Sequence, residues 1–175
     1  MPDHVVAWLR ELGAERVPHP GGTLLAHLVR VRLLLASWGA RPALRQAGLC
    51  HASYGTDGFA PALLPLARRP ELAAAIGSEA EGIVYLYASC DRAASHPTLG
   101  QGTAFRDRFT GRVHSPAPQA LRDFAEVSAA NELDLARTDP AFRARCGAGL
   151  LSLFGGFREL LSEPAWRECQ AVLGD

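Results

Sequence analysis

The segment from Leu24 to Trp38 has apolar residues three and four positions apart, the spacing that places side chains on one face of an α-helix. His27 falls on this apolar face. A second segment with the same spacing, Leu44 to His51, ends in another histidine on its apolar face. Both segments are therefore predicted to be helices that turn a histidine toward one core. A buried imidazole needs a partner, and two of them can share one metal ion.

Helical spacing continues over most of the chain, so we predict an all-α fold. Thr23 is the expected N-cap of the His27 helix, Gly39 its end, and Pro42 lies in the first turn of the next helix. Further helices are predicted at Asp3–Gly13, Pro70–Ile76, Ser78–Asp91 with Ser78 in its cap, Pro118–Arg137, Cys146–Leu161 and Ala165–Leu173. Asn131 lies on the apolar face of the Pro118–Arg137 helix. The least regular stretch is 95–118, with a turn or hairpin at Phe105–Gly111.

Composition limits the classes of function. The 175 residues, 48% of them hydrophobic, suffice for one core, so residues 1–175 are predicted to form a single domain. A net charge of zero predicts neither a nucleic-acid nor an anionic-membrane partner. All 18 basic residues are arginine, which excludes a Schiff-base lysine and a phosphate-loop lysine.

Cysteine usage and hydropathy suggest a compartment. The four cysteines form no Cys-x-x-Cys pair, and no segment reads as a signal peptide or a bilayer-spanning helix. We therefore expect a cytoplasmic protein with reduced thiols and no membrane contact. Cys50 and His51 diverge by about 100° on a helix, which favours an inert buried thiol over a Cys/His nucleophile. A small molecule is the expected partner, and a homo-oligomer is left open.

The stretch TLLAHLVRVRLLLASWGARPALRQAGLCHASYG resembles the opening of the HD-domain superfamily of metal-dependent hydrolases, in which a His-bearing helix is followed by a helix ending in ALLHD. The later superfamily motif, often ADKLD, corresponds to A-N-E-L-D at 130–134. The closest resemblance is to an uncharacterised branch, through His19–Thr23 and Leu49–Thr56, and it extends from about Val17 to about Leu135. It implies an HD-like helical bundle, with closing helices at about 140–173.

Two departures from the superfamily pattern change what the resemblance implies about metal binding. Ala52 stands where the superfamily has the Asp of His-Asp, and Asn131 stands where it has the last Asp. Without a bridging carboxylate, two dications are not held together. The resemblance thus implies a mononuclear site with His27 and His51 as ligands, to which Asn131 offers a neutral amide oxygen.

The rest of the ligand set is left open by the sequence. His19 would make three imidazoles plus water, a set that suits zinc and lowers the pKa of the bound water toward ~7. A carboxylate from Asp57, Asp91 or Glu132 would make two histidines and one acid, the set of mononuclear non-haem iron. We expect one transition-metal ion, Zn, Fe or Mn.

Other polar residues are candidates for substrate contact. Tyr54, three positions after His51, is a candidate for proton handling, as is Glu132; a core tyrosine is the competing interpretation for Tyr54. Arg92 and Arg106 are candidate anion contacts, and His96 is a candidate pocket residue. Solvated surface positions are the competing interpretation for both arginines.

We predict a metal-dependent enzyme that acts on a small molecule through hydrolase, lyase, cyclase or oxygenase chemistry. A role in small-molecule biosynthesis is one of the settings considered. Phosphoester hydrolysis is the default that the superfamily implies, and the loss of both Asp positions weakens it. The alternative is a metal-free HD-like protein, either an enzyme that uses His27 and His51 as acid and base or a binding module for a small molecule.

Overall fold

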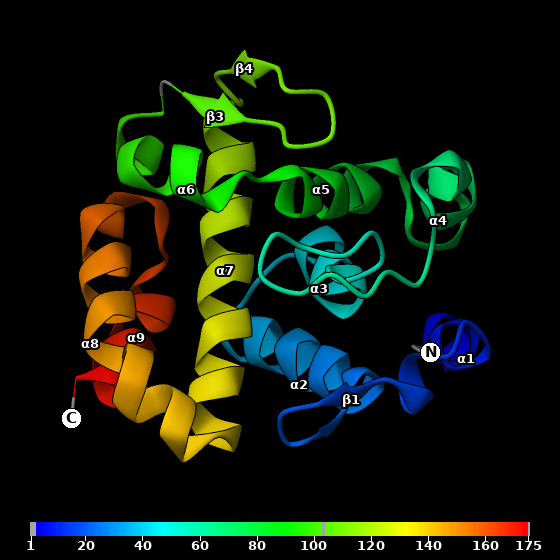
Figure 1. Ribbon diagram of the computed structural model, residues 1–175, viewed down its shortest axis with the longest axis horizontal. Helices are drawn as coiled ribbons and strands as arrows, with labels where there is room; N and C mark the ends of the chain where they lie inside the picture. Colours follow the sequence, from blue (N-terminus) through cyan, green and yellow to red (C-terminus); the bar gives the residue numbers. More distant parts are fainter. Residues whose placement is uncertain (1–2, 103, 175) are drawn as a thin grey trace.

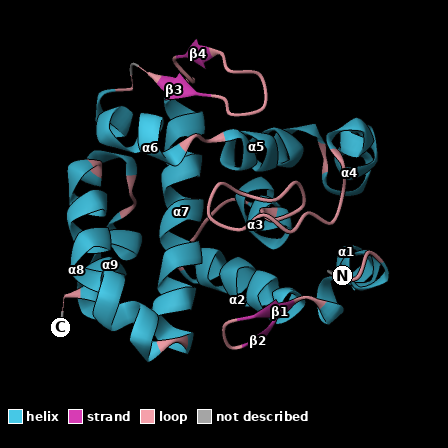
Figure 2. Ribbon diagram, in the orientation of Figure 1, coloured by secondary structure: helices cyan, strands magenta, loops and turns pink. Residues whose placement is uncertain are grey.

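A computed structural model describes residues 3–102 and 104–174, and within these residues the protein is all-α (Figure 2). Nine helices account for most of this part of the chain: α1 Asp3–Glu11, α2 Leu24–Ser37, α3 Pro42–Cys50, α4 Arg69–Ile76, α5 Ser78–Ser89, α6 Arg92–Ser95, α7 Pro118–Thr138, α8 Pro140–Gly156 and α9 Glu163–Leu173. Short 3₁₀ segments lie at Ala14–Arg16, Leu66–Arg68, His96–Gln101 and Arg158–Leu160. The helical prediction is confirmed.

The longest helix, α7, lies in the middle of the fold (Figure 1). It packs against α2, α3 and α5 on one side and against α8 and α9 on the other. Thirteen of its 21 residues are buried, and three of these carry acidic side chains: Asp123, Glu126 and Asp134. Because burying an unpaired charge is costly, each of these acids needs a partner from a neighbouring element. Helix α7 therefore carries polar groups into the centre of the molecule.

The boundaries of α2 and α3 follow the sequence prediction. The Thr23 hydroxyl accepts a hydrogen bond from the backbone N–H of Ala26, at 3.2 Å, and caps α2. Gly39, with φ of +77°, follows the end of α2, and Pro42 is in the first turn of α3. The two helices approach closely at Gly48, where an added Cβ would lie 2.3 Å from Leu35 Cδ1. This close contact brings the C-terminal end of α3 onto α2.

Two small antiparallel hairpins complete the fold. In the first, β1 (Pro18–His19) pairs with β2 (Gly22–Thr23), so His19 stands directly before α2. In the second, β3 (Phe105–Arg106) pairs with β4 (Val113–His114), within the stretch predicted to be irregular. Among the described residues no helix is both long and apolar enough to span a bilayer.

One predicted helix start and one predicted cap are wrong. Helix α8 begins at Pro140, six residues before the predicted Cys146, because the Asp139 carboxylate caps it by accepting hydrogen bonds from the N–H groups of Ala141 and Phe142. Ser78 is not a cap: α5 begins at Ser78 itself, with Gly77 at the N-cap position and φ of +91°. Glycine reaches this conformation readily, so Gly77 permits the tight turn between α4 and α5.

Candidate active site

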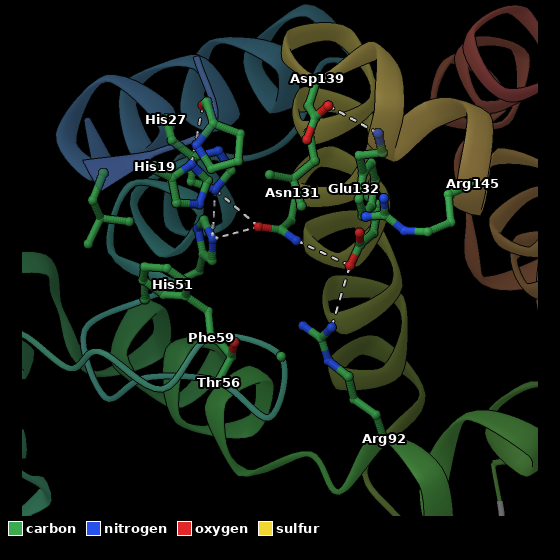
Figure 3. A pocket seen from close by; sticks show the side chains of 16 residues that line it. His19, His27, His51, Thr56, Phe59, Arg92, Asn131, Glu132, Asp139 and Arg145 are labelled. Atoms are coloured by element: carbon green, nitrogen blue, oxygen red, sulfur yellow. Dashed lines mark hydrogen bonds and ion pairs between the residues drawn. The ribbon is translucent and has the colours of Figure 1, made fainter. Parts of the chain in front are cut away.

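Three side chains from three helices meet at one point, as Figure 3 shows. His27 comes from α2, His51 from the C-terminal end of α3, and Asn131 from α7. The Asn131 Oδ1 atom lies 3.0 Å from His27 Nε2 and 3.1 Å from His51 Nε2, and the two ring nitrogens are 3.4 Å apart. All three residues are buried. The predicted convergence of His27, His51 and Asn131 is present.

The other ring nitrogen of His27 contacts a carboxylate. Its Nδ1 lies 2.6 Å from Oδ2 of Asp134, one turn after Asn131 on α7. Arg30, one turn after His27, donates from Nε and Nη2 to the same carboxylate at 2.7 and 3.0 Å. Burial alone would raise the pKa of Asp134, but the hydrogen bonds from His27 and Arg30 outweigh it and lower that pKa. Asp134 is thus an anion that holds the Nδ1–H of His27 and leaves Nε2 directed at Asn131.

A backbone carbonyl fixes which ring nitrogen of His51 carries the proton. Its Nδ1 lies 2.7 Å from the carbonyl oxygen of Gly48, which can only accept, so Nδ1 carries the proton. Burial, and next the nearby His27, lower the pKa of His51 to about 3. The ring is therefore neutral at physiological pH, and its Nε2 presents a lone pair.

The Asn131 amide presents a third lone pair to the same point. Its Nδ2 donates to Glu132 Oε1 at 3.3 Å, which turns Oδ1 toward the two rings. When both imidazoles are neutral, no proton lies between the three acceptor atoms. Ligand atoms bound at ~2.1 Å to one metal ion are separated by ~3.0–3.4 Å in octahedral or tetrahedral geometry. The spacing of the three atoms fits the edges of such a polyhedron.

His19 lies beside this cluster. Its ring stacks on that of His27, with centroids 4.0 Å apart and planes inclined by 26°. Imidazole lone pairs lie in the ring plane, so stacked rings do not direct them at a common atom. Among the described residues no group of three or more His, Cys, Asp or Glu side chains is arranged to hold a metal ion. The stacked orientation of His19 favours an amide over a third imidazole as the next ligand, and His19 as a ligand stays a prediction.

The cluster opens into a cavity of about 310 Å³. Its polar lining includes His19, His27, His51, Thr56, Arg92, Asn131, Glu132, Asp139 and Arg145. Ala52 also lines it, so the position that carries Asp in the HD-like pattern contributes a methyl group here. This position therefore has no carboxylate that could bridge a second metal ion.

Glu132 and Arg92 lie together at one side of this cavity. Glu132 Oε1 is 3.5 Å from Arg92 Nη1, and the Glu132 side chain is 13% exposed. Burial raises the pKa of Glu132, opposed by Arg92. A carboxyl with a raised pKa, next to the three convergent atoms, is suited to take up or deliver a proton. Glu132 is also the carboxylate candidate that the structure brings to the site.

The structure places the two other candidate acids away from the cluster. Asp57 accepts a hydrogen bond from the backbone N–H of Arg92, and Asp91 caps α6 by accepting one from Ala94. Neither is among the residues that line the cavity. Both have the structural roles common for aspartates in turns and caps, so the two-histidine, one-acid set now depends on Glu132.

Tyr54 and Arg106 are likewise not brought to the site. The Tyr54 hydroxyl donates to Glu81 at 2.8 Å, and Arg69 pairs with the same carboxylate, so Tyr54 is a core tyrosine with its hydroxyl occupied. Arg106, on β3, has a half-exposed side chain 3.7 Å from Asp91. His96 does line a cavity, but a neighbouring one, and burial lowers its pKa to about 4. Of the predicted substrate contacts, only Arg92 lines the cavity of the cluster.

Sequence reasoning missed the role of Asp134. It belongs to the A-N-E-L-D motif, and its spacing of three from Asn131 places both on one face of α7. A buried acid on the same face as a candidate ligand is the signal that could have identified it. Arg30, one turn after His27 on α2, is a basic residue whose position also indicates an ion pair with such an acid.

The comparisons with known proteins give a family match over part of the chain and no activity. Residues 8–92, just under half of the chain, match a family described as a domain of unknown function (DUF6817). The match includes His19, His27 and His51 and ends before Asn131. No curated protein and no solved structure matches the chain.

Proposed function

We propose that this protein is a metal-dependent enzyme acting on a small molecule through a mononuclear, variant HD-like site. The observation that carries the proposal is the convergence of His27 Nε2, His51 Nε2 and Asn131 Oδ1 within 3.0–3.4 Å. When both rings are neutral, the three lone pairs have no proton between them and repel one another, and a shared cation removes that repulsion. These three residues also stand at positions where the HD-like pattern has metal ligands.

The surroundings of the three atoms support the same interpretation. A ligating histidine usually donates its other N–H to a carboxylate or a backbone carbonyl, and such partners fix the ring and increase its basicity. His27 has Asp134 in this role and His51 has the carbonyl of Gly48. Two borderline imidazoles together with a hard amide oxygen form a ligand set that suits Zn, Fe or Mn.

A metal ion in this position would polarise a substrate oxygen or lower the pKa of a bound water. The remaining residues have separate tasks. Glu132, beside Asn131, exchanges a proton with the reacting group. Arg92 supplies a positive charge on the substrate side of the cavity, and Phe59 with Leu24 gives that cavity apolar walls. The proposed arrangement is compatible with hydrolysis, elimination, cyclisation and oxygenation.

Metal analysis of protein prepared without a chelating tag tests the proposal. We expect about one equivalent of Zn, Fe or Mn in the wild type, or after reconstitution with each metal in turn. His51→Ala should remove it, and His114→Ala, which removes an exposed histidine from β4, should leave it unchanged. Metal content that His51→Ala does not alter, or none after reconstitution, would contradict the proposal.

A second candidate is a metal-free enzyme in which His27 acts as base or acid. The His27–Asp134 contact of 2.6 Å favours it, because a carboxylate on Nδ1 stabilises a histidine that gains a proton at Nε2. Under this candidate, turnover persists in protein treated with a chelator, is lost in His27→Gln, and shows no dependence on added metal.

A further inference from the structure

A second cavity adjoins the candidate site. It measures about 260 Å³, and its wall shares three residues, Arg92, Glu132 and Phe142, with the cavity that holds the histidines. The shared residues come from α6, α7 and α8. Because the same side chains line both spaces, a molecule bound at the cluster has the second cavity directly beside it.

The second cavity, which we call the apolar chamber, is lined chiefly by α7, α8 and the turn after α8. Its apolar walls come from Phe124, Leu150, Leu153, Phe154 and Phe157. An apolar cavity of ~150 Å³ accommodates a benzene molecule. The larger chamber therefore has room for a ring or alkyl chain of more carbon atoms. Burying such a group releases water from both surfaces and favours binding.

Arg92, at the junction of the two spaces, differs from the arginines that stabilise the fold. Arg41 and Arg69 each make a two-pronged pair with a buried carboxylate, at 2.5–3.0 Å. To the residues that the structure describes, the Arg92 side chain makes only long polar contacts, 3.5 Å to Glu132 and 3.5 Å to the Tyr87 hydroxyl. Its side chain is 29% exposed. A guanidinium has five N–H donors and stays charged, so Arg92 keeps donors for an anionic group.

We propose that the substrate is an amphipathic organic acid, whose apolar body fills the chamber between α7 and α8 and whose anionic group binds Arg92. The inference rests on the proposed function, because it takes the neighbouring histidine cluster as the reacting centre. The substrate class then follows from the two spaces: a polar reacting end at the cluster, an acid at the junction, and an apolar ring or chain of medium length beyond it.

Cys146 gives a direct readout of the chamber. It lines the chamber and is half-buried, whereas Cys50, Cys90 and Cys169 are buried, and burial raises the pKa of each of these three thiols to about 12. Alkylation of the native protein by iodoacetamide should therefore occur at Cys146 first, as mass spectrometry of peptides will show. A ligand in the chamber should slow it.

The experiment measures the rate of Cys146 alkylation at increasing concentrations of a ligand, and the protection gives the affinity of that ligand. The ligands are straight-chain carboxylates from butanoate to decanoate and the matching alcohols, below their micelle concentrations. We expect affinity to rise about fourfold per methylene until the chamber is filled. Octanoate should bind at least tenfold more tightly than octanol, and Arg92→Gln should remove that difference without weakening octanol binding, because a charged hydrogen bond is lost. Arg112→Gln, an exposed arginine near β4, is the control.

Filling the chamber provides a second test. Leu153→Trp should abolish protection by octanoate, while Leu33→Trp, at an exposed leucine on α2, should leave it unchanged. Protection that does not depend on chain length, or equal binding of acid and alcohol in the wild type, would overturn the inference. Reconstituted wild-type protein separates the two proposals: protection by octanoate without metal binding retains the inference and refutes the metal site, and metal binding without protection does the reverse.

Discussion

Replacing Asp134 by asparagine tests whether this buried carboxylate orients His27 for metal binding. The substitution keeps the shape of the side chain and removes its charge. Asp134 now accepts three hydrogen bonds, one involving His27 at 2.6 Å and two from Arg30 at 2.7 and 3.0 Å. An amide oxygen can still accept from His27, but its NH₂ group faces Arg30 and repels it.

The size of the effect follows from burial. Removing one partner of a fully buried ion pair costs about 3–5 kcal/mol. Arg30 is one-third exposed and partly screened by solvent, so we expect a loss near the lower end, about 3 kcal/mol. For a chain of this length that corresponds to a fall in Tm of roughly 6–12 °C. Loss of the carboxylate partner of a ligating histidine typically lowers metal affinity by about 10- to 100-fold.

Asp123→Asn is the matched control. Asp123 is also a buried aspartate of α7 and also makes a two-pronged pair with an arginine, Arg41. It lies 11 residues away from Asp134, about 16 Å along the helix. The control should lose comparable stability and retain wild-type metal affinity.

The assay combines urea denaturation of metal-free protein, followed by circular dichroism, with metal titration against a competing chelator. Asp134→Asn should be altered in both measurements and Asp123→Asn in the first alone. If both variants lose stability and both bind metal as the wild type does, Asp134 does not orient a metal ligand, and the argument from the His27 contact is refuted.

Three further outcomes are expected. In urea denaturation, Gly48→Ala should destabilise the protein by about 1–3 kcal/mol, because the added Cβ would lie 2.3 Å from Leu35 Cδ1. Gly82→Ala on α5, where no atom lies within 4 Å of the added Cβ, should instead stabilise the protein by about 0.5–1 kcal/mol. Metal-free protein should lose stability as pH falls below 6.5, since the unfolded chain then protonates His51 while the folded ring, with a pKa of about 3, does not. This residue contributes about 2–3 kcal/mol between pH 6.5 and 4.5, so His51→Gln should reduce the pH dependence by that amount and leave the part that comes from His19 and His96, whose pKa values are lowered to about 4. Asn131→Asp should raise metal affinity roughly tenfold or more, because it adds a charged ligand, and should lower native activity, because that ligand reduces the Lewis acidity of the metal ion. Unchanged metal affinity in a chelator titration would contradict the ligand role of Asn131.

The spans of the helices and their buried faces could be read from the sequence because both depend on local geometry. Helical backbone repeats every 3.6 residues, so the spacing around His27 and Asn131 was enough to place both residues on buried faces. Caps are equally local: Thr23, Gly39 and Pro42 identify the ends of α2 and the start of α3. The start of α8 was missed although its signal, Asp139 before Pro140, is local too.

Which atoms meet was decided by the tertiary structure, because it depends on how the helices cross and rotate against one another. Asp134 lies 107 residues from His27, and no sequence spacing shows that its carboxylate meets Nδ1 rather than solvent. Likewise, the stacking of His19 on His27, the engagement of Tyr54 by Glu81, and the apolar chamber beside Arg92 arise from elements distant in the chain. The sequence alone placed His27, His51 and Asn131 on buried helix faces, and helix packing determined their partners.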